Sequence, residues 1–174
     1  MDFKFRNATI NDIDIIWKLL EQGIQKRKKE GSNQWQDGYP NKDVVRNDIE
    51  NNYGLIIEND KNTIIGYIAA IEEIEPAYEI IEGNWLTNDK YIVLHRLVVD
   101  TINPIKGLAT WIMHNIEQLI LDREIYSIKV DTNFDNIGML RIFDKLNYHY
   151  CGKVFFRGSP RLAFQKILSK KNEH

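Results

Sequence analysis

The sequence predicts an α/β fold in which helices pack against a mixed β-sheet. Three observations lead to this prediction. Apolar residues recur at helical spacing in three long segments, and the shorter apolar or alternating runs between them are typical of strands. Twice a strand is followed by a helix and a second strand, which implies some parallel pairing. The 174 residues, 43% of them hydrophobic, suffice for a globular domain with a sizeable core.

The N-terminal part alternates strand and helix patterns. Thr9 and Asp12 resemble a helix N-terminal capping pair, and the polar residues 59–62 suit a hairpin turn. The predicted elements are a strand at 3–6, a helix at about 10–28, an irregular segment at 31–40, a short helix at 42–51, and hairpin strands at 53–58 and 63–71.

The C-terminal part contains the strand–helix–strand units. Residues 72–89 show no clear periodicity. The strand at 90–99 is apolar on both faces except for His95 and Arg96, a pattern typical of a central strand. The further predicted elements are helices at 107–122 and 136–146 and strands at 126–130, 148–157 and 161–168. Without a linker or repeat, we expect a single domain over residues 1–168 and a tail at 169–174.

Composition excludes several classes of protein. The net charge of −2 provides no basic field for nucleic acid. Cys151, the single cysteine, excludes an internal disulfide and a thiolate zinc site, and we expect no metal. The N-terminus has no apolar signal core, and no apolar run approaches the ~20 residues of a membrane span. We therefore expect a soluble cytoplasmic protein without a membrane or nucleic-acid partner.

The turn at 103–109, between a buried strand and a helix, is the strongest functional signal. Gly107 lets the backbone approach a ligand closely, and Ala109 leaves the first helical turn uncrowded. The first N–H groups of a helix lack intrahelical acceptors and lie at the positive end of its dipole. With Lys106 beside them, they suit a pyrophosphate. The alternative is an ordinary strand-to-helix turn that contains a glycine.

Two segments resemble motifs of the GNAT superfamily of N-acetyltransferases. Residues 104–109, Pro-Ile-Lys-Gly-Leu-Ala, resemble its motif Q/R-x-x-G-x-G/A, with Pro104 in place of Gln or Arg. Residues 136–148 resemble its segment N-x-x-[AM]-x-x-[LIV]-[YF]-x-K-x-G-[FY], with Asn147 where Gly is usual. Asn is the usual second choice for a left-handed helix end.

The resemblance implies a bent, mostly antiparallel sheet with two splayed central parallel strands, helices on both faces, and acetyl-CoA as cofactor. The pantetheine arm would bond to strand backbone at 97–99, and the pyrophosphate would lie at 105–110. The residues that the resemblance assigns to the cofactor are Leu97, Val98, Val99, Ile105, Lys106, Gly107, Leu108, Ala109, Thr110, Asn136 and Phe143.

His95 is the candidate catalytic base. It shares a strand face with Leu97 and Val99, and an unperturbed imidazole suits proton transfer at neutral pH. Some GNAT enzymes carry a histidine at the matching position. The alternative is a core histidine bonded to backbone. Arg96 points to the opposite face, where we expect a structural role with a carboxylate partner.

The group that protonates the leaving thiolate stays open. Many GNAT members place a tyrosine where this chain has Phe143, which cannot donate a proton and can serve simply as a core aromatic. Tyr148, Tyr150, Cys151 or water could substitute.

The acceptor is indicated only in outline. In this family the segment after the first helix and the loop before the central strand border the acceptor cleft, and here they carry Trp35, Tyr39, Tyr78 and Trp85 among several glutamates. Aromatic faces and carboxylates suit an ammonium group; the alternative is that the aromatics anchor a solvated acidic loop to the core. The sequence thus predicts an N-acetyltransferase acting on a primary amine of a small molecule or peptide, with a non-catalytic acyl-CoA-binding or regulatory module as the alternative.

Overall fold

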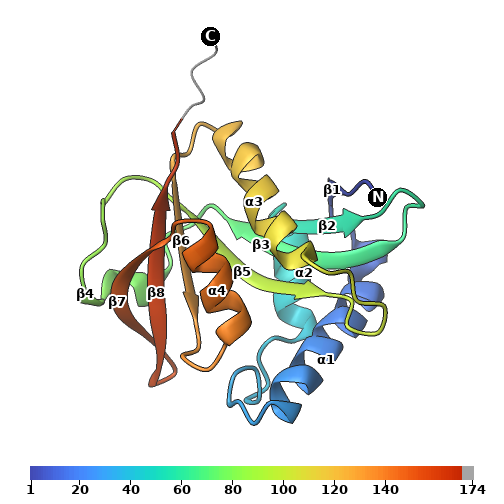
Figure 1. Cartoon of the computed structure of the whole chain (residues 1–174), viewed down its shortest axis with the longest axis horizontal. Coiled ribbons are helices and arrows are strands. Elements are labelled where there is room, and N and C mark those ends of the chain that lie inside the picture. Colours follow the sequence, from blue (N-terminus) through green and yellow to red (C-terminus); the bar gives the residue numbers. More distant parts are fainter. Residues whose placement is uncertain (170–174) are drawn as a thin grey trace. The chain divides into compact units, whose positions relative to one another are not determined.

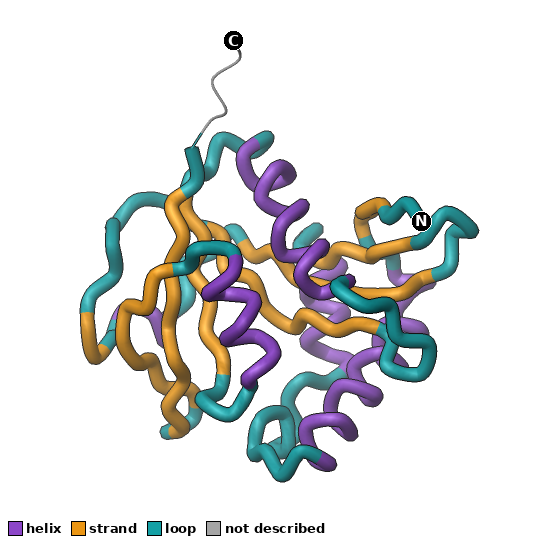
Figure 2. Tube along the Cα trace, in the orientation of Figure 1, coloured by secondary structure: helices purple, strands orange, loops and turns teal. Residues whose placement is uncertain are grey.

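The computed structural model describes residues 1–169, so most of the predicted tail, residues 170–174, lies outside the described part. Figures 1 and 2 show the elements along the chain. The helices are α1 (Ile13–Lys29), α2 (Lys42–Glu50), α3 (Leu108–Leu121) and α4 (Ile137–Lys145). The strands are β1 (Lys4–Asn7), β2 (Gly54–Glu58), β3 (Ile64–Ile71), β4 (Glu82–Gly83), β5 (Ile92–Val99), β6 (Ser127–Thr132), β7 (His149–Phe156) and β8 (Ser159–Ile167).

The predicted fold class is confirmed. The strands are hydrogen-bonded in the order β1-β2-β3-β5-β6-β8-β7-β4, and the sheet is mostly antiparallel with a central parallel pair, β5 and β6. None of the helices in residues 1–169 combines the length and apolar composition needed to cross a bilayer.

The chain divides by its internal contacts into two compact units. Unit 1 comprises Met1–Ile71 and Leu94–Ala109, and unit 2 comprises Glu72–Val93 and the chain from Thr110 onward. The boundary within the central strand falls between Val93 and Leu94. That the chain forms a single domain stays a prediction.

In unit 1, strands β1, β2 and β3 form an antiparallel sheet onto which α1 and α2 pack. The predicted hairpin turn is confirmed: the Asn59 side chain accepts hydrogen bonds from the N–H groups of Lys61 (2.9 Å) and Thr63 (3.0 Å). The buried residues of this core are Ala8, Ile16, Leu19, Leu20, Val45, Ile56, Tyr67 and Val98. They come from both helices and three strands, so the apolar stripe of α1 lies against the sheet as its spacing predicted.

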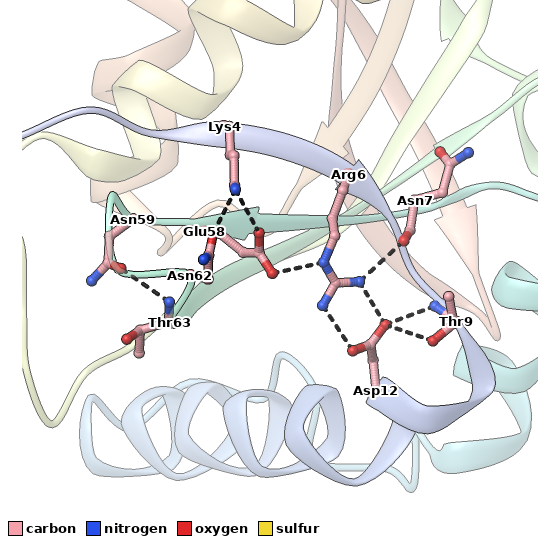
Figure 3. A network of polar contacts seen from close by, with 9 residues as sticks. All are labelled: Lys4, Arg6, Asn7, Thr9, Asp12, Glu58, Asn59, Asn62 and Thr63. Atoms are coloured by element: carbon pink, nitrogen blue, oxygen red, sulfur yellow. Dashed lines mark hydrogen bonds and ion pairs between the residues drawn. The ribbon is translucent and has the colours of Figure 1, made fainter.

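The entry into α1 is fixed by a polar network that Figure 3 shows. The predicted capping pair is confirmed, because the Thr9 N–H donates to Asp12 Oδ2 at 2.8 Å. Arg6 holds Asp12 in a bidentate pair (2.8 and 2.9 Å) and also donates to Glu58 at 2.7 Å. The hydrogen bonds from Arg6 lower the pKa of Asp12 to about 2, although burial opposes the shift. One guanidinium thus joins β1, β2 and the start of the helix.

In unit 2, β6 pairs with β8, β8 with β7 and β7 with β4, all antiparallel, while the first residues of β5 pair in parallel with β6 at Ile92↔Ile128. Helix α4 packs on this sheet through Phe143, whose ring centroid lies 4.9 Å from that of Phe164 on β8. Asn147 has φ 63° directly after α4, so the predicted left-handed helix end is confirmed.

Strand β6 is confirmed, but its polar residues are more buried than the alternating pattern indicates. Ser127 and Lys129 are only 2% and 4% exposed. The segment 72–91, which shows no periodicity in the sequence, contains a 3₁₀ turn (Pro76–Glu79) and the short strand β4. Its aromatic side chains cover the polar face of β6, as described below.

Candidate active site

The connection that leaves β5 in unit 1 is held by side chains on both sides. Asp100 accepts hydrogen bonds from the N–H groups of Ile102 (2.9 Å) and Asn103 (3.2 Å), and the Thr101 N–H donates to Gln22 on α1 at 2.9 Å. Burial would raise the pKa of Asp100, but these hydrogen bonds outweigh it and the pKa is lowered. The chain therefore enters the following turn from a fixed position.

The turn before α3 has the geometry that the sequence predicted. Gly107 has φ +79°, and apart from Gly107 and its two chain neighbours no atom of residues 1–169 lies within 4 Å of the place where a Cβ would stand. The Leu108 N–H donates to Ile105 O at 3.2 Å, which closes the turn. Within residues 1–169 the N–H groups of Lys106 and Gly107 have no protein acceptor, and the Lys106 side chain is exposed. Amide donors, an open approach and a positive charge thus occur together at the start of α3.

The second half of β5 alternates between two environments. His95, Leu97 and Val99 are half-buried, whereas Arg96 and Val98 are buried. Val98 belongs to the unit 1 core with α1. His95 therefore shares the half-buried environment of Leu97 and Val99, whereas the Arg96 side chain is buried within unit 1.

The expected carboxylate partner of Arg96 is Asp48 on α2. The guanidinium donates to both Asp48 oxygens, from Nε at 2.9 Å and from Nη2 at 2.5 Å. Its Nη1 donates to the Tyr39 hydroxyl at 2.6 Å. The structural role predicted for Arg96 is confirmed.

The segment 31–40, predicted to border the acceptor, packs against other parts of unit 1. Trp35 lies so close to Gly23 of α1 that a Cβ there would stand 2.9 Å from the ring and 3.1 Å from Val98. Tyr39 is held by Arg96, and the Gln36 side chain donates to Ile24 O at 2.9 Å. Both predicted aromatics are half-buried, so each ring keeps an exposed part.

The two predicted acceptor aromatics of unit 2 are turned inward. Tyr78 is 2% exposed, and its hydroxyl donates to Asp131 at 2.6 Å. Burial, together with the carboxylate, raises the pKa of Tyr78 well above its ordinary value. The Trp85 indole donates to Tyr78 O at 2.8 Å. These contacts favour the alternative in which the aromatics anchor the acidic segment to the core.

Lys129 is buried on β6, a position that its sequence context does not predict. Its ammonium lies 4.4 Å from the ring centroid of Trp85 and 4.1 Å from that of Tyr91, which is a favourable cation–π geometry. Burial lowers the pKa of Lys129. The only signal in the sequence was a lysine inside a strand opposite an aromatic-rich segment, and spacing alone could not bring the two together.

Two of the remaining predicted cofactor residues of unit 2, Asn136 and Phe143, have structural partners. Asn136 caps α4 by accepting from the Met139 N–H at 3.3 Å. Phe143 is 1% exposed and stacks with Tyr148 at 5.3 Å. Direct contact of Phe143 with a cofactor would require this packing to open, so the structure favours the core interpretation. Thr110, in the first turn of α3, is half-buried.

Comparison with solved structures establishes the family. An acetyltransferase of the GNAT family from Streptococcus agalactiae is 37% identical to this chain, with 97% of this chain and 96% of that chain covered and a TM-score of 0.87. The chain belongs to the GNAT family. A GNAT acetyltransferase from Listeria monocytogenes has the same fold at 21% identity, with 95% of each chain covered and a TM-score of 0.77. No family model and no curated protein sequence matches.

One structural neighbour with the GNAT fold contains a ligand. The protein yncA of Salmonella typhimurium, solved with its cofactor acetyl-CoA, is 12% identical over 100% of this chain and 98% of that chain, with a TM-score of 0.68. At this identity the likeness concerns the fold alone.

The GNAT turn motif of this chain keeps its backbone features despite Pro104. The leading Gln or Arg of the motif is a side-chain feature, whereas the positive φ of Gly107 and the amides beside it belong to the backbone. Pro104 is exposed and lies outside α3. The presence of Pro104 in place of Gln or Arg therefore leaves the amide donors in place.

Proposed function

We propose that the protein is an acetyl-CoA-dependent N-acetyltransferase that transfers an acetyl group to a primary amine of a small molecule or peptide. The turn before α3 carries the proposal: Gly107 at φ +79° lies in open space beside exposed Lys106. It follows the central strand of a chain that is 37% identical to a GNAT acetyltransferase.

The cofactor's diphosphate would bind at the turn. The N–H groups of residues 106 and 107, together with those of the first turn of α3, would donate to its oxygens, with Lys106 adding a full positive charge. The backbone of β5 at Leu97–Val99 would bond to the pantetheine arm. A diphosphate held mainly by backbone tolerates varied side chains, which fits the departure at Pro104.

When bound, acetyl-CoA would supply a thioester as acyl donor: the amine nitrogen would attack the carbonyl carbon, the C–S bond would break, and coenzyme A would leave as a thiolate. The ammonium form of the amine cannot attack, so a base must first remove its proton. His95 would accept that proton, directly or through water. Its half-buried position, shared with Leu97 and Val99, supports this role. Phe143 cannot protonate the thiolate, so this proton would come from Tyr148, Tyr150, Cys151 or water.

Release of coenzyme A thiol from acetyl-CoA, measured with a panel of primary amines, tests the proposal. His95→Gln should lower kcat by roughly 10²-fold or more if His95 is the base. His149→Gln is the matched control, because His149 is exposed on β7, and it should leave kcat unchanged. A loss that disappears at high pH, where the amine is already neutral, would support this role of His95 as the base that deprotonates the amine.

The same assay separates the alternative. If the protein binds acetyl-CoA but releases no thiol with any amine, and if neither histidine substitution changes its affinity for acetyl-CoA, it is a non-catalytic acyl-CoA-binding module. If coenzyme A neither binds nor raises the melting temperature, both versions are refuted.

A further inference from the structure

Arg96 has an unusual backbone conformation for a residue inside a β-strand. Its φ is +57°, between His95 and Leu97 in the middle of β5. This left-handed region is rarely occupied by residues with a side chain, and it persists only where the surroundings hold it in place. Contacts of the Arg96 side chain must therefore stabilise this backbone conformation.

The Arg96 side chain is held by a closed set of buried partners. Asp48 accepts from Nε and Nη2, and the Tyr67 hydroxyl donates to Asp48 Oδ2 at 2.6 Å. The side chains of Arg96 and Asp48 are 6% and 1% exposed. A planar guanidinium paired with both oxygens of a carboxylate has one preferred orientation, and in a buried site any other arrangement leaves charges unpaired.

Tyr39 connects this buried pair to the segment 31–40. Its hydroxyl accepts from Arg96 Nη1 at 2.6 Å, and the guanidinium lies 5.9 Å from the centre of its ring. Tyr67 and Tyr39 thus approach the same ion pair from different elements: Tyr67 from the sheet, and Tyr39 from the irregular segment that also carries Trp35.

We propose that Arg96 is a positioning residue for the acetyl transfer. Together with Asp48 it fixes the backbone turn at residue 96 and so the direction in which His95 leaves β5, and through Tyr39 it fixes segment 31–40 relative to the same point of the strand. This inference rests on the proposed function, in which His95 is the base and segment 31–40 borders the acceptor.

Two tyrosine substitutions provide a matched pair of tests. Tyr39→Phe and Tyr67→Phe each remove one hydroxyl from the same ion pair and keep the ring. We expect Tyr39→Phe to raise the KM for the amine roughly tenfold, a loss typical of slight misplacement of a binding group, with the KM for acetyl-CoA unchanged. Tyr67→Phe should lower the melting temperature without changing either KM.

Asp48→Asn tests the positioning of His95. It leaves Arg96 without its carboxylate, and we expect kcat to fall roughly tenfold or more with a displaced pH–rate profile, while coenzyme A binding measured by calorimetry is unchanged. Because this variant removes a buried charge, it could fail to fold; in that case the tyrosine pair decides.

Amide hydrogen exchange separates this inference from the proposed function. The inference predicts faster exchange at residues 31–40 in Tyr39→Phe, and no change in that segment in Tyr67→Phe. A raised amine KM without faster exchange would mean that Tyr39 contacts the substrate itself, and the positioning role would be wrong. Equal exchange in both variants would also overturn it. If the wild-type protein acetylates no amine, the proposed function fails, and the exchange comparison still decides whether the network holds the segment.

Discussion

Substitution of Gly107 is the sharpest test of the phosphate-binding turn, because the chain contains a matched glycine. Gly107 and Gly158 have φ values of +79° and +76°, and in the described part of the chain neither has an atom, other than those of its own residue and its chain neighbours, within 4 Å of the place where a Cβ would stand. Gly158 lies in the turn between β7 and β8. A valine in the left-handed region should cost about 1–2 kcal/mol of folding free energy at either position, so the structural cost of the two substitutions cancels in the comparison.

The expected difference comes from ligand binding alone. At Gly107 the valine methyl groups would occupy the open space beside the amides and hold a phosphate away from them. A hydrogen bond to a charged acceptor contributes about 1.5–3 kcal/mol. Loss of one such bond should therefore weaken coenzyme A binding roughly 10- to 100-fold, whereas Gly158→Val should leave the affinity unchanged.

Isothermal titration calorimetry with coenzyme A measures the two affinities, and the ligand-induced rise in melting temperature provides a second readout on the same samples. Equal dissociation constants for the two variants would refute the assignment of the diphosphate to this turn.

Two further predictions concern stability. Asp12→Asn should lower the free energy of unfolding by about 1 kcal/mol at pH 7. Arg6 lowers the pKa of Asp12 from 3.8 to about 2, so this stabilisation is present above 3.8 and is lost as the pH falls through 2. The exposed Asp43→Asn is the control, and an equal loss at pH 7 and below pH 2 would contradict the reasoning. Tyr148→Phe should leave the unfolding free energy unchanged or raise it by up to about 1 kcal/mol, because in residues 1–169 the buried Tyr148 hydroxyl has no hydrogen-bond partner. Tyr78→Phe removes a hydroxyl bonded to a carboxylate and should lower the unfolding free energy by about 1–2 kcal/mol. Urea denaturation measures the unfolding free energy of both variants. A greater loss for Tyr148→Phe than for Tyr78→Phe would contradict the expectation that the Tyr148 hydroxyl contributes no stability.

Features that depend on near neighbours were predictable from the sequence. The Thr9–Asp12 cap, the left-handed Asn147 and the positive φ of Gly107 each follow from residues within a few positions along the chain. The alternating burial of β5 was also predictable, with His95 half-buried and Arg96 buried. These local rules also carried the motifs that indicated the family.

Features that depend on distant contacts were not predictable to the same depth. A carboxylate partner for Arg96 was expected, but Asp48 lies 48 residues away, and nothing in the sequence singles it out. The left-handed conformation of Arg96 depends on its contacts with Asp48 and Tyr39, which are distant in the sequence. The burial of Tyr78 and the half-buried position of Trp85 likewise depend on how segment 72–91 docks onto β6.

The enclosure of Lys129 between two rings has a practical consequence. Acetic anhydride and related reagents acylate lysines that solvent can reach, and Lys129 is 4% exposed. It should therefore resist labelling while the lysine side chains at the surface react. A reagent could reach Lys129 only when Trp85 and Tyr91 move away from it. The rate at which Lys129 is labelled would therefore measure how often these two rings uncover it.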